Sequence, residues 1–448
     1  MLIEKTPSTS SLEKALQEIQ EGFSLPASSV VEIADEFRRA MREGLYEGKG
    51  PLKMLPSFLG KPTGQEEGIY VAVDFGGTNI RVLIASLRGK EIEIIGEPVK
   101  LPIRDIDGGK YDLTSESVTG TELFDFVAQM VSQVVTSNES YYLGHTFSFP
   151  SRQENINTAF LITWTKEIKA SGVVGEDVNK LLAQALVRKG LFGITPRAVL
   201  NDTVGTLLVE SYSNPYADIG SICGTGHNTC YIEPNLGKER GPMIVNMESG
   251  NFNRSLPSTA YDKLIDQTSE KPGAQLLEKM VSGQYLGELF RLVICDLVSR
   301  GLLFTGILNE FPFKTGCVSS GCLSQLLSGQ EYEVDRLLKN QWGISEWSAD
   351  EISAMRTIAS CIVNRAARLA TATYLGVLKH IDPEIAEKHV IAVDGSIYEK
   401  TPGFAQAIND ALEEVLLDKA KKITVKLTKD GSGIGAAIAA AMSLNIDS

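Results

Sequence analysis

The spacing of hydrophobic residues changes along the chain, and each spacing predicts a different kind of element. Residues 11–45 repeat hydrophobic side chains at helical intervals and are predicted to be helical. The side chains that fall on one face of this helix are Ile33, Phe37, Ala40 or Met41, and Leu45. Ser29 and Glu32 have the spacing of a capping box, which marks a helix start. Residues 46–68 are rich in Gly, Pro and Lys, so they are predicted to form a loop or linker.

Two later stretches have the pattern of an antiparallel β-meander, each with glycine at its first turn. The strands of the first meander are predicted over residues 68–75, 80–87 and 91–99, with GGTN (76–79) as the turn. The strands of the second are predicted over residues 218–223, 227–234 and 242–248, with GTG (224–226) as the turn. Because the two meanders start about 150 residues apart, they indicate a duplicated domain architecture and not a short-period repeat.

Helical spacing occupies most of the remaining chain. The predicted helices are residues 176–190, 273–302 and 352–380, and the second is expected to break near Ser282 and Gly283. A strand over residues 389–396 and a strand, glycine-rich turn and helix over residues 426–442 follow. Mixed sheets covered by helices, in two repeats, predict an α/β protein with two lobes.

Composition and charge narrow the class of protein. The 448 residues are enough for two or three domains, and 43% hydrophobic with 22% charged residues is typical of a globular protein. A net charge of −13 argues against a nucleic-acid partner or an anionic membrane face, since both need a local excess of Lys and Arg. Phosphate ligands stay compatible with this charge, because backbone amides can bind them locally.

No targeting or cysteine pattern stands out. No hydrophobic run approaches the ~20 residues that span a bilayer, and the N-terminus lacks the basic start and apolar core of a signal peptide. The six cysteines and four histidines are scattered, and only Cys317 and Cys322 lie near each other. We therefore expect no disulfide framework and no structural metal, and a reduced, cytoplasmic location.

Three glycine-rich turns are candidate phosphate-binding loops, although the chain has neither a P-loop nor a dinucleotide fingerprint. The turns at 76–78 and 224–226 can direct successive backbone N–H groups to one side. The third, at 430–437, leads into a predicted helix start, which favours anions. Singly, each is most simply a structural turn; in two repeats, the first two would face each other across a cleft. Asp74, just before the first turn, could hold a Mg²⁺ shell through water.

The stretch VLNDTVGTLL (199–208) contains a carboxylate with two interpretations. Asn201, Asp202 and Thr203 are all favoured at helix starts, so Asp202 taken alone is most simply a helix cap. Alternatively, Asp202 is a base that accepts a proton during the reaction. The two interpretations are compatible, because Asn201 or Thr203 can start the helix while the Asp202 carboxylate faces a cleft.

Seven segments, taken in order, resemble the hexokinase family of the actin-like ATPase superfamily. They are VAVDFGGTNIRV, HTFSFPSRQENINTAFLITWTKEI, VLNDTVGTLL, ICGTGHNTCYIEP, NMESGNF, VIAVDGSIYEKTPGF and KLTKDGSGIGAA, and the resemblance runs from about residue 50 to 440. It implies a two-lobed actin-like ATPase (ribonuclease H-like) fold, with a duplicated mixed β-sheet core and a cleft between a small and a large domain. The implied division is residues 1–58 as an N-terminal helical segment and linker, 59–202 plus 436–448 as the small domain, and 203–435 as the large domain.

The resemblance also implies an activity, the ATP- and Mg²⁺-dependent phosphorylation of the 6-hydroxyl of a hexose, with glucose as the expected sugar. Asp202 would be the catalytic base, and Lys166 would supply positive charge beside a ligand that becomes anionic. The implied sugar-binding residues are Ser151, Thr165, Lys166, Asn201, Asp202, Asn228, Glu248, Gln275 and Glu278. The implied nucleotide-side residues are Asp74, Gly76, Gly77, Thr78, Asn79, Arg81, Gly224, Thr225, Gly226, Gly395, Ser396, Gly431 and Ser432, with Asp74 near Mg²⁺ through water.

These residue types suit the chemistry. Each sugar hydroxyl both donates and accepts, so selective binding needs converging carboxylates and amides. Phosphoryl transfer needs alignment, charge neutralisation and a base for the attacking hydroxyl. Water is a similar nucleophile at far higher concentration, so the site has to be completed only when sugar is bound. Two lobes closing on a cleft would do this.

Three departures from the family pattern and two alternatives accompany this interpretation. Ser249 stands where the family often has Trp, and Glu167 and Ile168 stand where it often has Gly-Phe, which bears on selectivity among sugars. His227 replaces a smaller or apolar residue and is expected to be incidental. One alternative, a hexokinase-like sugar sensor without turnover, would be expected to have lost the base or a phosphate loop. The other, an actin- or chaperone-like ATPase, leaves the WTK and NMES segments unexplained. Monomer and homodimer both stay open.

Overall fold

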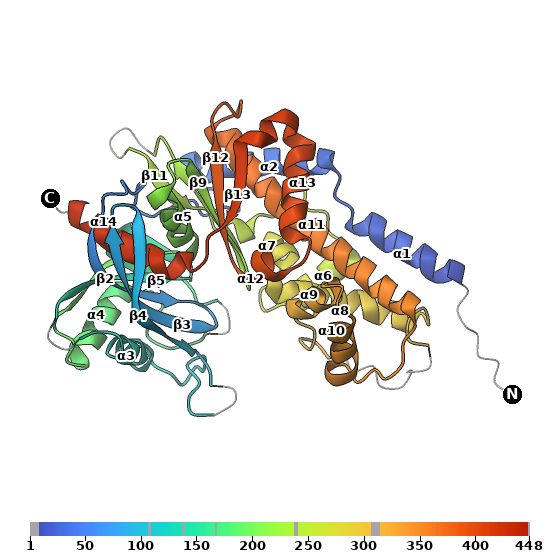
Figure 1. Cartoon of the computed structure of the whole chain (residues 1–448), viewed down its shortest axis with the longest axis horizontal. Coiled ribbons are helices and arrows are strands. Elements are labelled where there is room, and N and C mark those ends of the chain that lie inside the picture. The colour runs from blue at the N-terminus through green and yellow to red at the C-terminus, as the bar shows by residue number, and fades with distance from the viewer. Residues whose placement is uncertain are drawn as a thin grey trace.

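The chain folds into two lobes, each built on a mixed β-sheet (Figure 1). We call the part built on the five-stranded sheet the small lobe and the part built on the six-stranded sheet the large lobe. The structure is a computed structural model, and it describes residues 9–105, 109–136, 139–165, 168–236, 241–305 and 314–446.

The sheet of the small lobe has the strand order β4-β3-β2-β5-β8. Its strands are β2 (Gly68–Phe75), β3 (Asn79–Arg88), β4 (Glu91–Pro102), β5 (Tyr141–Phe147) and β8 (Ile194–Leu200). The first three form the predicted antiparallel meander, and β5 and β8 run parallel to β2. Other elements of this lobe are α3 (Gly120–Val131), α4 (Val178–Arg188) and the hairpin β6 (Ser151–Asn155) and β7 (Thr158–Leu161).

The sheet of the large lobe has the order β1-β11-β10-β9-β12-β13. Its strands are β1 (Leu55–Pro56), β9 (Ala217–Cys223), β10 (His227–Glu233), β11 (Met243–Asn246), β12 (His389–Asp394) and β13 (Ile423–Leu427). Strands β9 to β11 form the second predicted meander, and β12 and β13 run parallel to β9. Apart from the added β1, the order and directions repeat those of the small lobe, so the predicted duplication is confirmed.

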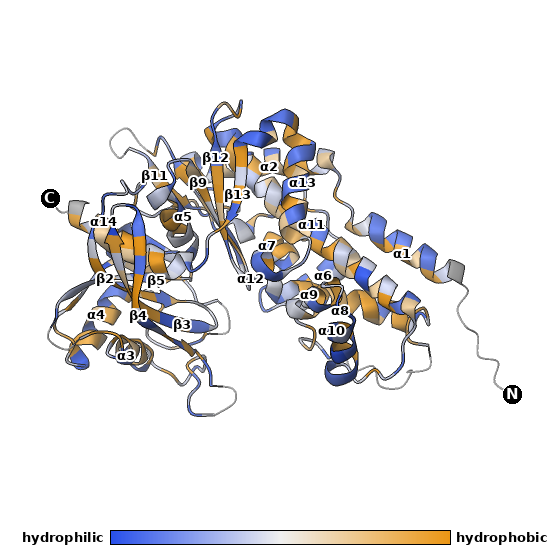
Figure 2. Ribbon diagram, in the orientation of Figure 1, coloured by the Kyte–Doolittle hydropathy of each residue, from blue (hydrophilic) through white to orange (hydrophobic). Residues whose placement is uncertain are grey.

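Helices make up the rest of the large lobe. They are η1 (Ser249–Asn251), α6 (Ala260–Thr268), α7 (Leu276–Val281), α8 (Gly283–Ser299), α9 (Ser320–Leu327), α10 (Glu331–Arg336), the π-helical η2 (Leu337–Gln341), α11 (Ala349–Ile381), α12 (Ser396–Lys400), α13 (Phe404–Leu416) and η3 (Leu417–Lys422). The predicted break at Ser282 separates α7 from α8. Figure 2 shows α10 on the outside as largely hydrophilic, whereas β12 is largely hydrophobic. No helix within the described ranges is both long and apolar enough to cross a bilayer.

The N-terminal helical region differs from its prediction in two respects. It forms two helices, α1 (Thr9–Phe23) and α2 (Ala27–Glu47), that pack on α11. The predicted capping box is wrong, because α2 begins directly after Pro26, whose backbone is extended. Pro26 disfavours helical backbone at the residue before it, which places the break there. Glu32 instead accepts a hydrogen bond from the Ser255 hydroxyl at 3.1 Å. The predicted buried face of α2 is confirmed for Ile33, Phe37, Ala40 and Met41.

Two helices, α5 (Asp202–Ser213) and α14 (Gly431–Ile446), lie between the sheets and meet backbone to backbone. A methyl group on Gly435 of α14 would lie 2.3 Å from the Cα of Gly205 in α5. A methyl group on Gly144 of β5 would lie 1.7 Å from a carbonyl oxygen of α14, and one on Gly220 of β9 would lie 2.6 Å from a carbonyl oxygen of α5. The two sheets are therefore connected through α14 and α5 by direct main-chain contacts, which are possible because glycine has no side chain at these positions.

The core of the small lobe contains a histidine in an apolar setting. His145 of β5 is fully buried, and its ring packs with those of Phe75, Phe124 and Phe147 at centroid distances of 5.5–6.4 Å. Neither ring nitrogen has a hydrogen-bond partner within the described part of the chain. Burial lowers the pKa of His145 to about 3, so the ring is neutral at neutral pH.

Replacing His145 with phenylalanine is expected to stabilise the protein by about 1–3 kcal/mol, because it removes buried polar atoms that lack partners. The variant should also resist acid better. As pH falls below 6.5, the ordinary pKa, the unfolded chain takes up a proton that the folded His145 refuses until about pH 3. The contribution of His145 to the free energy of unfolding of the wild-type protein therefore falls by about 1.4 kcal/mol for each pH unit in that window. Urea unfolding at pH 7.5 and 5.5 measures both effects, and equal pH slopes for the two proteins would contradict this assignment.

Candidate active site

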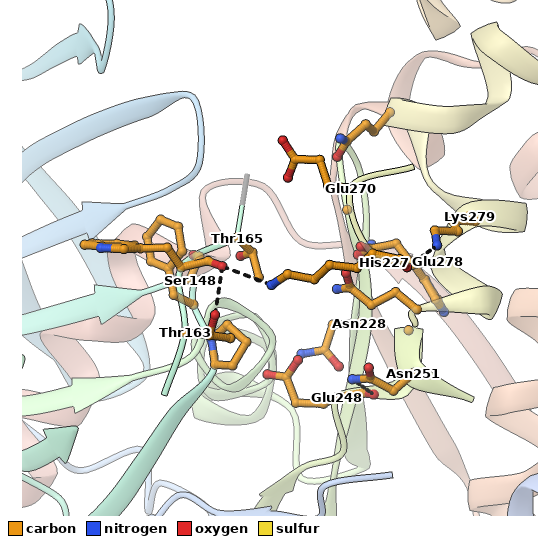
Figure 3. Close-up of a pocket in the computed structure, with 18 of the residues that line it drawn as sticks. Ser148, Thr163, Thr165, His227, Asn228, Glu248, Asn251, Glu270, Glu278 and Lys279 are labelled. Carbon is orange, nitrogen blue, oxygen red and sulfur yellow. Dashed lines mark hydrogen bonds between the residues drawn. The ribbon is translucent and has the colours of Figure 1, made fainter. Parts of the chain in front are cut away.

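A cleft of about 610 Å³ lies between the lobes, and most of the predicted sugar-binding residues line it. Figure 3 shows Thr163 and Thr165 of the small lobe on one side, with Asn228, Glu248 and Glu278 of the large lobe facing them. The small-lobe residues come from the turns after β5 and after β7. The large-lobe residues come from the starts of α5, β10, η1 and α7.

The residue that caps α5 is identified by the hydrogen bonds at the start of the helix. Asn201 is the cap, because its side-chain oxygen accepts hydrogen bonds from the backbone N–H of Thr203 at 3.0 Å and from the Thr203 hydroxyl at 2.7 Å. Asp202 is the first helical residue, and its carboxylate lines the cleft. One oxygen of that carboxylate accepts the Thr203 N–H at 2.9 Å, which holds it at the positive end of the helix. Asp202 is therefore placed to act on a ligand and is not needed as the cap.

A chain of amide side chains connects the start of α5 to Glu248. The Asn228 side chain donates to the Asn201 oxygen at 3.3 Å and to the Asn246 oxygen at 2.8 Å, and Asn246 donates to Glu248 at 2.9 Å. Asn246 was not predicted from the sequence. Its position two residues before Glu248, at the end of β11, was the only signal. Because each amide orients the next, the chain fixes the donors and acceptors that face the cleft.

Two of the cleft residues adopt left-handed backbone conformations that non-glycine residues rarely take. Glu248 has φ 53° and ψ 51°, and Gln275 has φ 53° and ψ 42°. Such conformations cost of order 1–3 kcal/mol and persist where the surroundings enforce them, often at ligand sites. For Gln275 the surroundings are a loop held by the Asp266 carboxylate, which accepts bonds from the Gly273 N–H at 2.9 Å and from the Lys279 ammonium at 2.6 Å.

Glu278 of α7 is held against the second glycine turn. Its carboxylate accepts the backbone N–H of His227 at 2.9 Å. Added methyl groups on Gly226 and Gly250 would each lie 3.0 Å from Glu278 side-chain atoms, so glycine allows this close approach. The Nδ1 of the His227 ring lies 3.1 Å from the Ile222 carbonyl oxygen, and burial lowers the pKa of the ring to about 4.

On the small-lobe side of the cleft, Trp164 contacts both its own lobe and a lysine of the large lobe. Trp164 packs its ring against Phe149 and donates its indole N–H to the Ala170 carbonyl at 2.8 Å. The ammonium of Lys271, from the loop before α7, lies 3.5 Å from the Trp164 carbonyl oxygen and reaches across the cleft. Lys271 was not predicted, since nothing in its local sequence indicates this contact. The predicted site residue Lys166, and Glu167 beside it, lie outside the described residues.

Two predicted positions lie off the cleft surface. Ser151 begins β6 and donates its hydroxyl to the Phe149 carbonyl at 3.1 Å, whereas the nearby Ser148 lines the cleft. Ser249 is fully buried, and its hydroxyl lies 3.3 Å from the Thr229 hydroxyl. Ile168, the other departure from the family pattern, is buried but lines the cleft. Sugar contact by Ser151, and any effect of Ser249 on selectivity, stay predictions.

The predicted nucleotide-side residues meet where both sheets adjoin the start of α14. Gly224 and Gly395 are in contact, since a methyl group on Gly224 would lie 3.4 Å from the Cα of Gly395. The Ser432 hydroxyl donates to the Asp74 carboxylate at 2.6 Å. Across the antiparallel pair of β2 and β3, Asp74 is directly opposite Arg81. The remaining members of the set lie in the turns or begin the element that follows, and are Gly76, Gly77, Thr78, Asn79, Thr225, Gly226, Ser396 and Gly431.

Asp394, at the end of β12, joins two of these turns and was missed from the sequence. Its carboxylate accepts the Gly395 N–H at 2.7 Å with one oxygen and the Gly431 N–H at 3.1 Å with the other. Burial raises the pKa of Asp394 above its usual range, and the negative charges of Asp430 and Asp202 raise it further. The only sequence signal for Asp394 was its place directly before Gly395 and Ser396, in the segment DGS. Within the described ranges, no group of three or more His, Cys, Asp or Glu side chains is arranged to hold a metal ion.

Comparisons with known proteins agree with this arrangement. Two sequence models of the hexokinase family match the chain, one over residues 15–212 and the other over residues 218–442. The chain is 35% identical over 466 residues to the chloroplastic Hexokinase-4 of Oryza sativa subsp. japonica, covering 97% of this chain and 89% of that protein. It is 33% identical over 457 residues to Hexokinase-1 of Schizosaccharomyces pombe, covering 96% and 91%.

Longer relatives and solved structures extend the similarity. Hexokinase-1 of Mus musculus is 34% identical over 460 residues, which are 97% of this chain but 46% of that protein, so the chain spans about half of that relative. The structure of the Schistosoma mansoni hexokinase complexed with glucose is similar with a TM-score of 0.83 and 32% identity, covering 97% of this chain and all of that one. The chain therefore belongs to the hexokinase family, the enzymes that phosphorylate hexoses with ATP.

Proposed function

We propose that this enzyme transfers the γ-phosphoryl group of ATP to the 6-hydroxyl of glucose, with Asp202 as the general base. The observation that carries the proposal is the position of the Asp202 carboxylate. It lies in the cleft at the start of α5, beside the amide chain that ends at Glu248. The glucose-bound Schistosoma relative supports glucose as the sugar. A sugar sensor without turnover has no support, because the base position and the glycine turns are all retained.

In the proposed step, the sugar O6 attacks the γ-phosphorus while its proton passes to Asp202. The bond between the γ-phosphorus and the β,γ-bridging oxygen breaks, and ADP leaves with that electron pair. The Thr203 N–H keeps the base oriented at 2.9 Å from one carboxylate oxygen. Glu248, Glu278 and the amide side chains would bind the remaining sugar hydroxyls. In a closed cleft without water, these polar groups find hydrogen-bond partners only on a sugar.

The glycine turns and the start of α14 would hold the phosphates through backbone N–H groups, with Arg81 and the Ser432 hydroxyl as further donors. Mg²⁺ usually binds one or two carboxylates together with substrate phosphates. Asp74, which adjoins both Arg81 and Ser432, fits that role through water. The ion would neutralise charge that develops on the phosphates.

Lobe closure is proposed to exclude water. The sugar-side segment of the small lobe, Thr163 to Thr165, faces the large-lobe residues across the cleft. Closing this gap around a sugar would complete the site only for the correct nucleophile. A cytoplasmic location, as well as the choice between monomer and homodimer, stays a prediction; the rice relative is chloroplastic.

A coupled assay for hexose 6-phosphate, run with ATP and Mg²⁺ over a panel of hexoses, tests the proposal. We expect product with glucose, and none with 6-deoxyglucose, which lacks the attacking hydroxyl. Binding of 6-deoxyglucose, followed by fluorescence of Trp164 in the cleft, would separate recognition from transfer. Absence of product with every hexose would refute the proposed reaction.

A further inference from the structure

The start of α14 carries an ion pair that the proposed reaction does not use. Asp430, the residue just before α14, forms an ion pair with the Arg81 guanidinium of β3. Arg81 is one of the groups expected near the ATP phosphates. Asp430 is about half exposed and adopts left-handed backbone with φ 57°.

The Asp430 contact is one of three in which a carboxylate takes a donor suited to phosphate. Asp394 accepts the Gly431 N–H at 3.1 Å, and Asp74 accepts the Ser432 hydroxyl at 2.6 Å. The donors themselves are typical phosphate ligands, namely a helix N-terminal N–H, a hydroxyl and a guanidinium. Asp74 and Asp394 each have another task, since Asp74 adjoins the expected Mg²⁺ position and Asp394 also bonds the Gly395 N–H at 2.7 Å. Within the described ranges, the only hydrogen bond of the Asp430 side chain is the one with Arg81.

We propose that Asp430 is a placeholder for phosphate: it holds Arg81 in position, competes with ATP for that guanidinium, and releases it when the phosphates arrive. This inference rests on the proposed function, because it assumes that ATP phosphates lie beside Arg81. It makes Asp430 a positioning residue that sets nucleotide affinity. It also favours Mg²⁺-bound over metal-free ATP, since the more negative ligand is repelled more strongly by a fixed carboxylate.

Other charges near Asp430 do not serve the same purpose. The neighbouring Lys429 forms its ion pair with Glu399 of α12 at 2.6 Å, and its charge acts on Asp430 only through space. A carboxylate at the N-terminal end of a helix also cancels part of the positive potential that would otherwise attract an anion. Removing the charge at position 430 should therefore strengthen phosphate binding in two ways, by freeing Arg81 and by restoring this potential.

The test is Asp430→Asn, since asparagine tolerates left-handed backbone and keeps the shape of the side chain. We expect the KM for ATP to fall about three- to tenfold and the KM for glucose to change less than twofold. Calorimetric titration with ATP in EDTA should show a larger gain in affinity than titration with ATP and Mg²⁺. Asp430→Gly, which suits the same backbone, serves if the asparagine variant folds poorly.

Two comparisons separate this proposal from a general charge effect. Glu399→Gln removes one nearby negative charge but leaves the Arg81 ion pair, and should change the ATP KM less than twofold. In an Arg81→Gln background, Asp430→Asn should give less than half of its gain, because there is no guanidinium to release. A full gain in that background, or an unchanged or higher ATP KM in the single variant, overturns the proposal. If wild-type protein makes no sugar phosphate from ATP, the proposed function fails instead.

Discussion

Replacing Asp202 with alanine is expected to lower kcat for glucose phosphorylation by at least about 10²–10⁴-fold, the range typical of losing a general base. The fold should stay largely intact, because Asn201 and not Asp202 caps α5. Coupled-assay kinetics measure the loss, and thermal unfolding confirms that the variant is folded. Turnover within tenfold of wild type would mean that another group is the base.

A matched control for Asp202 is available in the small lobe. Asp177 caps α4, where its side chain accepts the Asn179 N–H at 3.1 Å, and it does not line the cleft. Asp177→Ala should cost about 1 kcal/mol of stability, as cap removal usually does, while kcat stays within twofold. A large loss of kcat in both variants would show that disturbing a helix start lowers kcat, and that the loss in Asp202→Ala does not identify Asp202 as the base.

Replacing Asp262 with alanine is expected to cost about 3–5 kcal/mol of unfolding free energy, because it leaves a buried guanidinium without its partner. Arg365 of α11 is fully buried and donates to both Asp262 oxygens at 2.7 Å. The same carboxylate accepts the Thr259 backbone N–H at 2.8 Å in the capping box of α6, so this half of the box is lost as well. Urea unfolding measures the cost.

An exposed ion pair provides the comparison for this buried one. Asp418 and Lys421 pair at 2.9 Å, with side chains 95% and 81% exposed. Asp418→Ala should change stability by no more than about 0.5 kcal/mol, because solvent screens the pair and holding it costs side-chain entropy. Comparable losses at both positions would contradict the assigned role of burial.

The strands and turns could be predicted from the sequence because their signals are local. Strand β2 matches its predicted span, and both meanders turn at the predicted glycines. The start of α2 could not be placed, because the Ser29 and Glu32 spacing is a weak signal and Pro26, three residues earlier, decides the boundary. The spacing of Ser29 and Glu32 shows only that they could form a capping box, whereas the nearby Pro26 determines where the helix begins.

The residues of the candidate site also fall into those that could be predicted from the sequence and those that could not. The roles assigned to Asn228 and Glu248 came from the quoted family segments, and that of Glu278 from the family resemblance outside them; the structure brings the three side chains into one cleft. Asp430 was missed because its partner Arg81 lies 349 residues away in the chain. Asn246 lies only two residues from Glu248, but its bond to Asn228 spans 18 residues, and neither residue stands out by type. Contacts of this length are set by the packing of whole elements, which periodicity does not reveal.

The backbone contact between α5 and α14 also determines what lobe motion can and cannot change. Asp202 is the first residue of α5, and the phosphate-side donors Gly431 and Ser432 begin α14. A methyl group on Gly205 would lie 3.1 Å from atoms of both Gly431 and Ser432, so the two helix starts are locked together. The proposed base and the proposed phosphate donors thus lie on two helix starts that are in main-chain contact. The proposed closure of the lobes would therefore move the sugar-binding side chains of the small lobe more than it changes the spacing between base and phosphate donors.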